Sequence, residues 1–332
     1  MRALPYFLCP VLLCLGLGTM PLRAQVTFDW AEVGDAGNAA DPLNSGSIPG
    51  IGSVSSTYRI ATTEVSLSQY VAFLNAVAQT DLYGLYNTNM SSNLNVAGIN
   101  RSGSSGSYTY SVIGSGNRPV TYVSWSDAAR FTNWMHNGQG SGGTESGVYD
   151  LSLSSPSRSA SALYWIPSEN EWYKAAYYDP GAGGPADDYW LYPTRSDTAP
   201  DNTIGPAPNN ANIRDGSVNY AVTNSSTYDA NQDYLTDVGA FSGAASYYGT
   251  FDQGGNVFEW TDSLVLTDKR VLRGGSWNLF ESNMRSSFQL SNPETYEAMA
   301  VGFRLASTPK PSTYALLVVG GAALFALRRR RV

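Results

Sequence analysis

Cysteine is almost absent from this chain of 332 residues. Its two cysteines, Cys9 and Cys14, both lie in an apolar N-terminal segment, so the remainder of the chain can form no disulfide. The only histidine is His136, and a single histidine excludes a metal centre built on three histidines or on two histidines and a carboxylate. His136 falls at the end of a predicted helix, where its charge complements the helix dipole.

Positive charge is also scarce once the two ends of the chain are set aside. Residues 25–308 hold 13 basic and all 27 acidic residues, a formal charge of −14. This balance argues against nucleic acid as a partner, because phosphate binding requires a basic face. It is compatible with calcium, which takes oxygen ligands. Charged residues are only 14% of the chain, whereas 33 glycines and 22 tyrosines predict many turns and much aromatic packing.

The N-terminal residues 1–24 have the pattern of a secretory signal peptide. Arg2 supplies a positive start, residues 4–18 are mostly apolar, and Ala24 ends an imperfect small-residue cleavage site. The alternatives are an uncleaved anchor and a hydrophobic first strand. We expect the protein to be exported.

The C-terminal residues 309–332 form a second candidate sorting segment. An apolar run at 314–327 is shorter than the roughly 20 residues of a spanning helix, and four arginines follow it. This layout resembles the PEP-CTERM signal, although Lys310 stands where the motif has glutamate. The resemblance implies transient membrane association, removal of the tail by an exosortase-type peptidase, and a location at the cell surface or in the extracellular matrix. A plain tail anchor is the alternative.

Residues 25–308 are predicted to form one domain with three main helices. The N-cap residues are Ser66, Ser124 and Ser168, and the third residue of each helix is a capping partner: Gln69, Asp127 and Glu171. Apolar residues follow each cap at helical spacing. Short strands are predicted at 58–60 with 63–65, at 108–113, at 271–272 and at 303–305, and long loops at 137–161 and 181–211.

An ordered set of blocks resembles the formylglycine-generating enzyme, or sulfatase-modifying factor, family. The blocks are RIATTEVSLSQYVAFLNAVA, NRPVTYVSWSDAARFTNWMHNG, YWIPSENEWYKAAYY, GGNVFEW, RVLRGGSW and VGFRLA, and they span residues 58–305. The resemblance implies the family's α+β fold, a loop-rich variant of the C-type lectin fold with short strands. This fold agrees with the three predicted helices and the many loops.

The residues that carry the family's oxidase chemistry are missing. Family enzymes hold copper(I) between two thiolates just after the RGGSW block, and the matching positions here are Leu279 and Met284. Leucine has no donor atom, and one thioether does not replace two thiolates. We therefore predict no catalytic residues for formylglycine formation and no copper, with Met284 packed in the core.

The resemblance also implies structural calcium. The first set of ligands corresponds to Asp252, Gly255, Val257 and Glu259, through side-chain oxygens and backbone carbonyls. A second set corresponds to Asn212 and Ile213 in the stretch ANI, with Asp229 or Asp233 as the carboxylate. Alternatively, Glu259 is a surface carboxylate and the glycines form a plain turn.

Other polar residues in the blocks are predicted to be structural. Asp187-Asp188 and the pair Glu169 and Glu171 are expected to be solvated or capping, and Ser276 has no basic partner to make it a nucleophile. Three arginines are expected to anchor loops through hydrogen bonds: Arg273, Arg285 and Arg304.

Two classes of function remain. The first is a calcium-stabilised binding or structural module on the cell surface, whose aromatic loop 189–192 stacks on a glycan or peptide or else packs in the core. The second is an oxidoreductase or another metal-dependent enzyme that uses carboxylates or tyrosines in place of thiols. Bound redox-active metal would favour the enzyme, and calcium alone the binding module.

Overall fold

The computed structural model describes residues 25–44, 49–181, 188–265 and 267–309. The segments predicted as sorting signals, 1–24 and 310–332, lie outside this part of the chain. Within the described residues, no helix has both the length and the apolar character needed to cross a bilayer.

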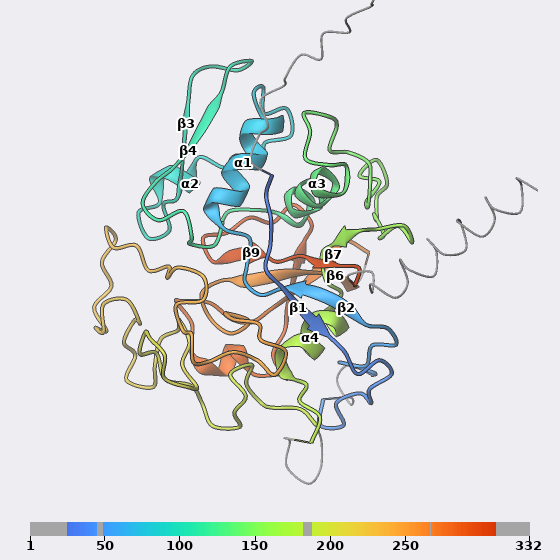
Figure 1. The fold of residues 1–332 in the computed structure, drawn as a ribbon. Helices are drawn as coiled ribbons and strands as arrows, with labels where there is room; N and C mark the ends of the chain where they lie inside the picture. The colour runs from blue at the N-terminus through green and yellow to red at the C-terminus, as the bar shows by residue number, and fades with distance from the viewer. Residues whose placement is uncertain (1–24, 45–48, 182–187, 266, 310–332) are drawn as a thin grey trace, which may run out of the picture.

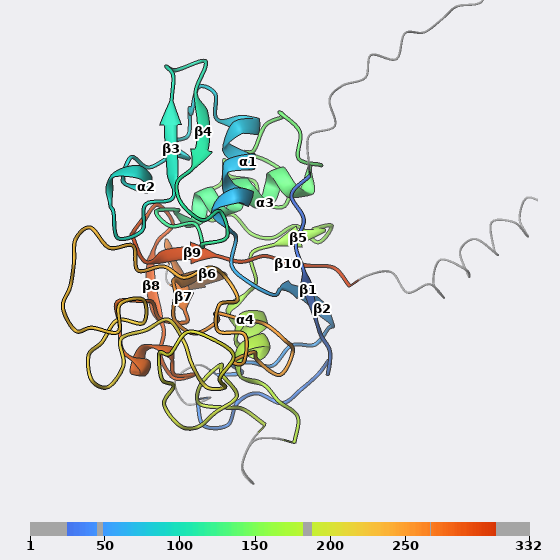
Figure 2. The same ribbon diagram turned by 60° about the vertical axis from the view of Figure 1, so that its left-hand side comes forward.

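Two four-stranded sheets and one hairpin form the β part of the fold (Figures 1 and 2). The first sheet has the order β1 (Trp30–Val33), β2 (Tyr58–Ala61), β10 (Ala306–Ser307) and β5 (Tyr164–Trp165). The second has the order β8 (Leu290–Pro293), β7 (Lys269–Arg273), β6 (Phe258–Val265) and β9 (Val301–Phe303), with β6 and β9 parallel. The hairpin pairs β3 (Ile99–Ser102) with β4 (Thr109–Val112). Because β10 pairs with β2, the first sheet joins the two ends of the described chain.

Three helices of two to three turns begin where the serine caps predict. They are α1 (Leu67–Val77), α3 (Trp125–His136) and α4 (Glu169–Tyr177), and both halves of the capping box are present in each. A one-turn helix, α2 (Asn89–Ser92), and a 3₁₀ turn, η1 (Glu281–Met284), complete the helical elements among the described residues. The cap predictions are confirmed, because a cap depends on residues only three positions apart.

The main core is an aromatic cluster between α1, α3 and the strands. Phe131 of α3 lies against Tyr70 and Phe73 of α1 and against Phe303 of β9, with ring centroids 5.3–6.1 Å apart. These side chains are almost fully buried. Each aromatic pair stabilises the fold by about 0.5–1.5 kcal/mol beyond the free energy of burying its apolar surface. These contacts therefore hold α1 and α3 firmly to the second sheet.

The strand predictions are partly right. The pairing of 108–113 as a hairpin is confirmed, whereas 63–65 is a turn and Arg304-Leu305 lies between β9 and β10. Val65 still donates its backbone N–H to the Phe303 carbonyl, but this single contact does not extend into a ladder. The eight-residue strand β6 is missing from the prediction, because its sequence alternates only over residues 258–261 and the register shifts between Trp260 and Leu264.

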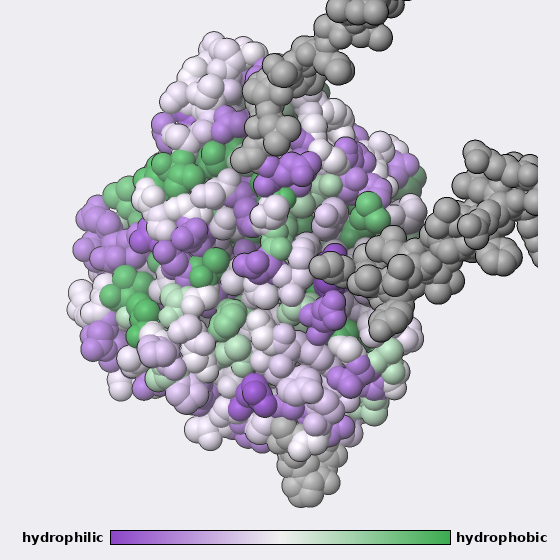
Figure 3. Space-filling model, viewed as in Figure 1, coloured by the Kyte–Doolittle hydropathy of each residue, from purple (hydrophilic) through white to green (hydrophobic). Residues whose placement is uncertain are grey.

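Most of the chain between α4 and β6 is loop, packed through tyrosines. In Figure 1 this segment, coloured yellow to orange, fills the lower part of the molecule. Figure 3 shows that apolar residues on one face form small groups separated by polar ones. A face of this kind offers no extended apolar surface for association.

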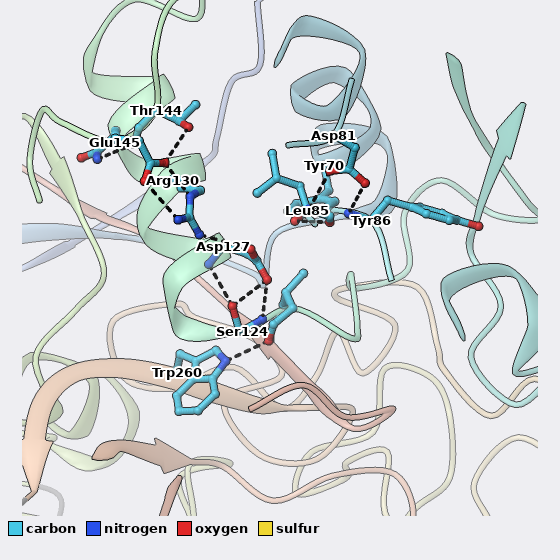
Figure 4. A network of polar contacts seen from close by, with 12 residues as sticks. Tyr70, Asp81, Leu85, Tyr86, Ser124, Asp127, Arg130, Thr144, Glu145 and Trp260 are labelled. Atoms are coloured by element: carbon cyan, nitrogen blue, oxygen red, sulfur yellow. Dashed lines mark hydrogen bonds and ion pairs between the residues drawn. The ribbon is translucent and has the colours of Figure 1, made fainter. Parts of the chain in front are cut away.

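A polar network surrounds the start of α3 (Figure 4). Asp127 accepts hydrogen bonds from the backbone N–H and the hydroxyl of Ser124, at 3.0 and 2.6 Å. Arg130 lies 3.8 Å from its other oxygen and binds Glu145 more closely, at 2.7 Å. Burial raises the pKa of Asp127 to about 7, against the lowering effect of the bonds from Ser124. The cost of desolvation therefore exceeds the benefit of a charge at the helix N-terminus.

We expect Asp127→Asn to flatten the pH dependence of stability between about pH 4 and pH 7. The pKa of Asp127 is higher in the folded protein than in the unfolded chain, so the folded state binds more protons in this range. Its contribution to the free energy of unfolding is full below pH 4 and is lost as the pH rises to 7, by on the order of 1.4 kcal/mol per unit of raised pKa. Urea unfolding at several pH values measures this. Asp237→Asn, at an exposed position, is the control, and an equal slope in wild type and Asp127→Asn would contradict the prediction.

Candidate functional site

The RGGSW block forms a tight turn at the end of β7. Gly274 and Gly275 both have positive φ, 100° and 76°. A Cβ atom on Gly274 would lie 2.9 Å from the Gln253 carbonyl oxygen, so only glycine brings these two loops so close. Trp277 then stacks on Tyr234, with parallel rings 4.8 Å apart. The turn therefore contacts both the start of the GGNVFEW block and the loop that carries Tyr234.

The two positions that match the family's thiols hold apolar packing residues. Met284 is fully buried and packs with Ala211, Ile213 and Tyr192. Leu279 is half-buried against the main core, and its carbonyl accepts the Arg214 N–H at 2.8 Å. At these two positions the only sulfur atom is the Met284 thioether, and Met284 is not accessible to solvent. Both residues contribute to apolar packing.

Beneath this turn, Glu259 of β6 forms a fully buried ion pair with Arg304. The Arg304 guanidinium donates to both carboxylate oxygens, at 2.6 Å each, and the Trp172 indole N–H donates to one of them at 2.8 Å. Arg304 also donates to the carbonyls of Ala61, Thr62 and Phe251. The alternative prediction of a surface Glu259 is wrong, because its side chain is completely inaccessible.

Two more carboxylates lie near this pair, so the buried group contains three acids and one base. Burial raises the pKa of Glu64 well above its usual value, and the charges of Asp252 and Glu259 raise it further. One oxygen of Glu64, Oε2, has no hydrogen-bond partner. Burial raises the pKa of Asp252 to about 6. The group thus has one base, Arg304, for three acids, and Arg304 forms its ion pair with Glu259.

The residues predicted to bind calcium come together next to the Glu259–Arg304 pair. Asn212 bridges to Gly255, and the Asn212 carbonyl accepts the Asn256 N–H at 2.9 Å. Both oxygens of Glu259 are engaged by Arg304, and Asp252 Oδ2 accepts the Gly239 N–H at 2.5 Å. No group of three metal-binding side chains occurs in the part of the chain that the structure describes. Calcium binding by this set therefore stays a prediction.

The second predicted set, unlike the first, does not come together. Asp233 pairs with Arg118, and Asp229 accepts the backbone N–H of Asn231. Asn212 Nδ2 donates to the Tyr234 carbonyl, and Ile213 packs against Met284. Neither carboxylate is therefore directed at Asn212 or Ile213.

The predicted roles of the arginines and of the first turn of α4 are only partly right. Arg273 and Arg304 anchor loops as expected, and Arg273 donates to the carbonyls of Ser286 and Phe288. Glu169 is buried against Arg273 at 2.5 Å instead of being solvated or capping. Arg285 is exposed and lies over the Tyr192 ring. The difference arises because Glu169 and Arg273 are 104 residues apart, beyond the range of any local pattern.

His136 lies at the end of a helix, as predicted, but it acts there as a hydrogen-bond acceptor and not as a positive charge. It is the last residue of α3, and its Nδ1 accepts the backbone N–H of Leu163 at 3.2 Å. Ser276 Oγ donates to the Asn278 side chain and contacts no base. Asp188 accepts the Gly181 N–H, whereas Asp187 lies outside the described residues.

The aromatic loop 189–192 packs in the core instead of facing a ligand. Tyr189 and Tyr192 are 5% and 4% exposed, and Tyr189 contacts the rings of Tyr173 and Tyr178. The Trp190 indole donates to Asp179 at 3.0 Å. Of the two alternatives for this loop, core packing is the right one.

A different group of aromatic side chains lies at the surface next to Leu279. The Arg214 guanidinium lies between the rings of Tyr220 and Phe280, at 4.9 and 5.0 Å. Tyr220 is buried, at 8% exposure, and contacts Tyr228, which is 52% exposed. Phe280 is 36% exposed. We call Arg214, Tyr220, Tyr228 and Phe280 the Phe280 face. Sequence reasoning missed it, because an isolated β-bridge between two residues far apart in the chain brings Phe280 beside Arg214.

Together, the fold and site define a loop-rich α+β domain in which buried arginine–carboxylate pairs join distant blocks. Residues 37–309 match the profile of the sulfatase-modifying factor enzyme 1-like domain, and the chain belongs to this family. A search of curated proteins finds no match.

Solved structures with a similar backbone fold have low sequence identity to this protein. CarF is 19% identical with a TM-score of 0.48, over 86% of this chain and 99% of CarF. Variable protein 1 of Treponema denticola is 18% identical with a TM-score of 0.46, over 86% and 97%. PvdO from Pseudomonas aeruginosa is 16% identical with a TM-score of 0.43, over 77% and 82%. Similarity at this level carries no information about function.

Proposed function

We propose that this protein is a non-catalytic binding module of the sulfatase-modifying factor family, exported to the cell surface. The observation that carries the proposal is the burial of Met284 and the packing of Leu279 at the positions of the family's thiols. Cys9 and Cys14, the only cysteines, lie in the predicted signal peptide. The family's oxidases hold copper(I) between two thiolates, and residues 25–308 contain no cysteine.

We expect the purified protein to leave the cysteine of a sulfatase-motif peptide unchanged, even with copper and oxygen. Mass spectrometry of the peptide tests this, with a family enzyme that retains both cysteines as the positive control. Leu279→Cys with Met284→Cys is also expected to be inactive, because the side chain at 284 lies in a closed core and the residues around it are apolar. Formation of the aldehyde by the wild-type protein would overturn the proposal.

The Phe280 face is the surface we assign to ligand binding. Exposed aromatic rings beside a guanidinium suit a sugar, whose apolar face stacks on a ring while its hydroxyls accept hydrogen bonds from the arginine. Arg214 makes no ion pair among the described residues, and its hydrogen bonds to the Val218 carbonyl are long, at 3.3 Å. We therefore propose a surface glycan as the ligand. Transient association with the membrane through the C-terminal segment, and its removal by an exosortase-type peptidase, belong to the same proposal.

We expect Phe280→Ala and Tyr228→Ala to reduce glycan binding about fivefold or more, because loss of a stacking ring removes about 1 kcal/mol or more. A glycan array identifies the ligand, and titration calorimetry then measures the affinity. Tyr247→Ala is a matched control, since Tyr247 is 42% exposed but belongs to the separate cluster with Tyr248. Binding of a peptide instead of a glycan, or equal loss in the control, would contradict this assignment.

The second candidate function is an enzyme that uses carboxylates instead of thiols. The observation in its favour is the buried group of Glu64, Asp252 and Glu259, since perturbed pKa values often mark active sites. The side chains of Glu64 and Glu259 are fully buried, which favours a structural role. Metal analysis of the purified protein tests the alternative, because stoichiometric copper or iron would support the enzyme.

A further inference from the structure

A pocket of about 250 Å³ lies at the edge of the first sheet, where β2 and β5 begin and β10 ends. This volume is several times the roughly 30 Å³ of one water and just below the roughly 300–1,000 Å³ of pockets for drug-sized ligands. The pocket therefore has room for one small molecule, and it shares no residue with the Phe280 face. Its lining residues are Ser56, Thr57, Tyr58, Arg158, Ser159, Ala160, Ala162, Trp165, Glu171 and Thr308.

The buried part of the pocket holds one arginine in a fixed position. The Arg158 guanidinium lies over the Trp165 ring, 4.7 Å from its centroid, and forms an ion pair with Glu171 at 3.0 Å. Glu171 also accepts the Trp165 indole N–H at 3.0 Å and the Ser168 N–H of the α4 cap at 2.7 Å. Trp165 and Glu171 are both buried. Because two further donors fix the carboxylate, the guanidinium is oriented before any ligand arrives.

Arg158 uses only one of its three nitrogens in this pair. Nη1 donates to both oxygens of Glu171 at 3.0 Å, whereas Nε and Nη2 have no hydrogen-bond partner among the described residues. The side chain of Arg158 is 33% exposed. Its Nε–H and one Nη2–H lie parallel along one edge of the guanidinium, which is the arrangement that matches the two oxygens of a carboxylate. Arg158 therefore keeps this edge available for a ligand.

Three hydroxyl groups of the pocket are available in the same way. The side-chain oxygens of Ser56, Thr57 and Thr308 make no hydrogen bond within the part of the chain that the structure describes. A hydroxyl donates one hydrogen bond and accepts two, so these three side chains suit the hydroxyl groups of a ligand. The Arg158–Glu171 pair has no net charge. Recognition of an anion here therefore depends on direct contact with the free edge of Arg158 and not on long-range attraction.

We propose that this pocket binds a small hydroxy acid of the hexuronic type. Its carboxylate accepts the Nε–H and Nη2–H of Arg158, and its hydroxyl groups bind Ser56, Thr57 and Thr308. Two charge-assisted hydrogen bonds to a planar carboxylate are stronger than bonds to neutral hydroxyls, so the acid is favoured over a plain sugar. A phosphate monoester carries a second negative charge, which the neighbouring Glu171 carboxylate repels. The proposal does not rest on glycan binding elsewhere on the molecule.

Titration calorimetry of the full-length protein with D-glucuronate and D-galacturonate tests this. The methyl ester of each acid keeps the shape and removes the charge, D-glucose lacks the carboxylate, and glucose 6-phosphate carries a phosphate instead. We expect saturable binding of at least one acid, and binding of its ester and of glucose that is weaker by about tenfold or more. Absence of binding for both acids, or equal binding of an acid and its ester, would overturn the proposal. Tighter binding of glucose 6-phosphate than of either acid would also overturn it.

Three variants, each checked for folding by circular dichroism, locate the site. Arg158→Lys keeps a positive charge beside Glu171 but removes the planar edge, so the affinity for the acid should fall about fivefold or more. Thr57→Val leaves the ion pair intact and should lower the affinity about threefold, through the loss of one hydrogen bond. Arg285→Gln removes an exposed arginine outside the pocket and should leave the affinity unchanged. An unchanged affinity in Arg158→Lys or Thr57→Val would overturn the proposal, as would an equal loss in Arg285→Gln.

Discussion

Replacing Glu259 by alanine is expected to lower the free energy of unfolding by about 3–5 kcal/mol, because it leaves a buried guanidinium without its carboxylate. Arg304 and Glu259 are both 0% exposed, so water cannot replace the lost partner. The Trp172 indole N–H loses its acceptor in the same change. Urea unfolding followed by circular dichroism measures the loss.

Two further variants separate the unpaired charge from lost packing. Replacing the pair by apolar residues, Glu259→Leu with Arg304→Met, should cost less than Glu259→Ala alone. Glu145→Ala removes the partner of Arg130 at a site where the glutamate is 35% exposed, and should cost at most about 1 kcal/mol. Equal losses in Glu145→Ala and Glu259→Ala would show that burial of the pair is unimportant.

The same variant tests the calcium that the family resemblance implies. If calcium binds through Glu259, the wild type melts higher in calcium than in chelator, and Glu259→Ala narrows this gap. If the variant loses stability equally in both buffers, the loss comes from the Arg304 pair. Identical melting of the wild type in calcium and in chelator would show that the calcium prediction is wrong.

Replacing Gly255 by alanine is expected to destabilise the protein by about 2–5 kcal/mol, through overpacking and backbone strain together. Gly255 has φ 84°, and a Cβ atom there would lie 2.5 Å from the Asn212 carbonyl oxygen. That carbonyl accepts the Asn256 N–H, so it cannot move away without breaking the contact between the two loops. Thermal or urea unfolding measures the effect.

Gly249→Ala is a matched control that measures the cost of backbone strain without overpacking. Gly249 has nearly the same φ, 82°, and a Cβ atom there would meet nothing within 4 Å. It should therefore cost only the strain of a left-handed residue, about 1–2 kcal/mol. If the two variants lose equal stability, the close approach of Gly255 to Asn212 has no energetic weight.

Local features of the fold were predictable because they depend on near neighbours. Each of the three helices begins at a serine whose capping partner lies three residues later, and the hairpin at 108–113 has an alternating pattern. The predictions were less reliable at 63–65 and 303–305, where pairing depends on strands far away in the chain. Strand β6 was not recognised, because three polar residues in succession, 261–263, interrupt its alternation.

At the candidate site, the sequence by itself determined which chemistry is missing. Leu279 and Met284 carry no thiol, and no arrangement of residues 25–308 supplies one. Only the tertiary structure decided which polar groups meet: Arg304 with Glu259, Arg273 with Glu169, and Arg158 with Glu171 beside one pocket. The reason is physical. A buried charge must find a partner wherever the folded chain brings one, and the partners of Glu169 and Glu259 lie 104 and 45 residues away.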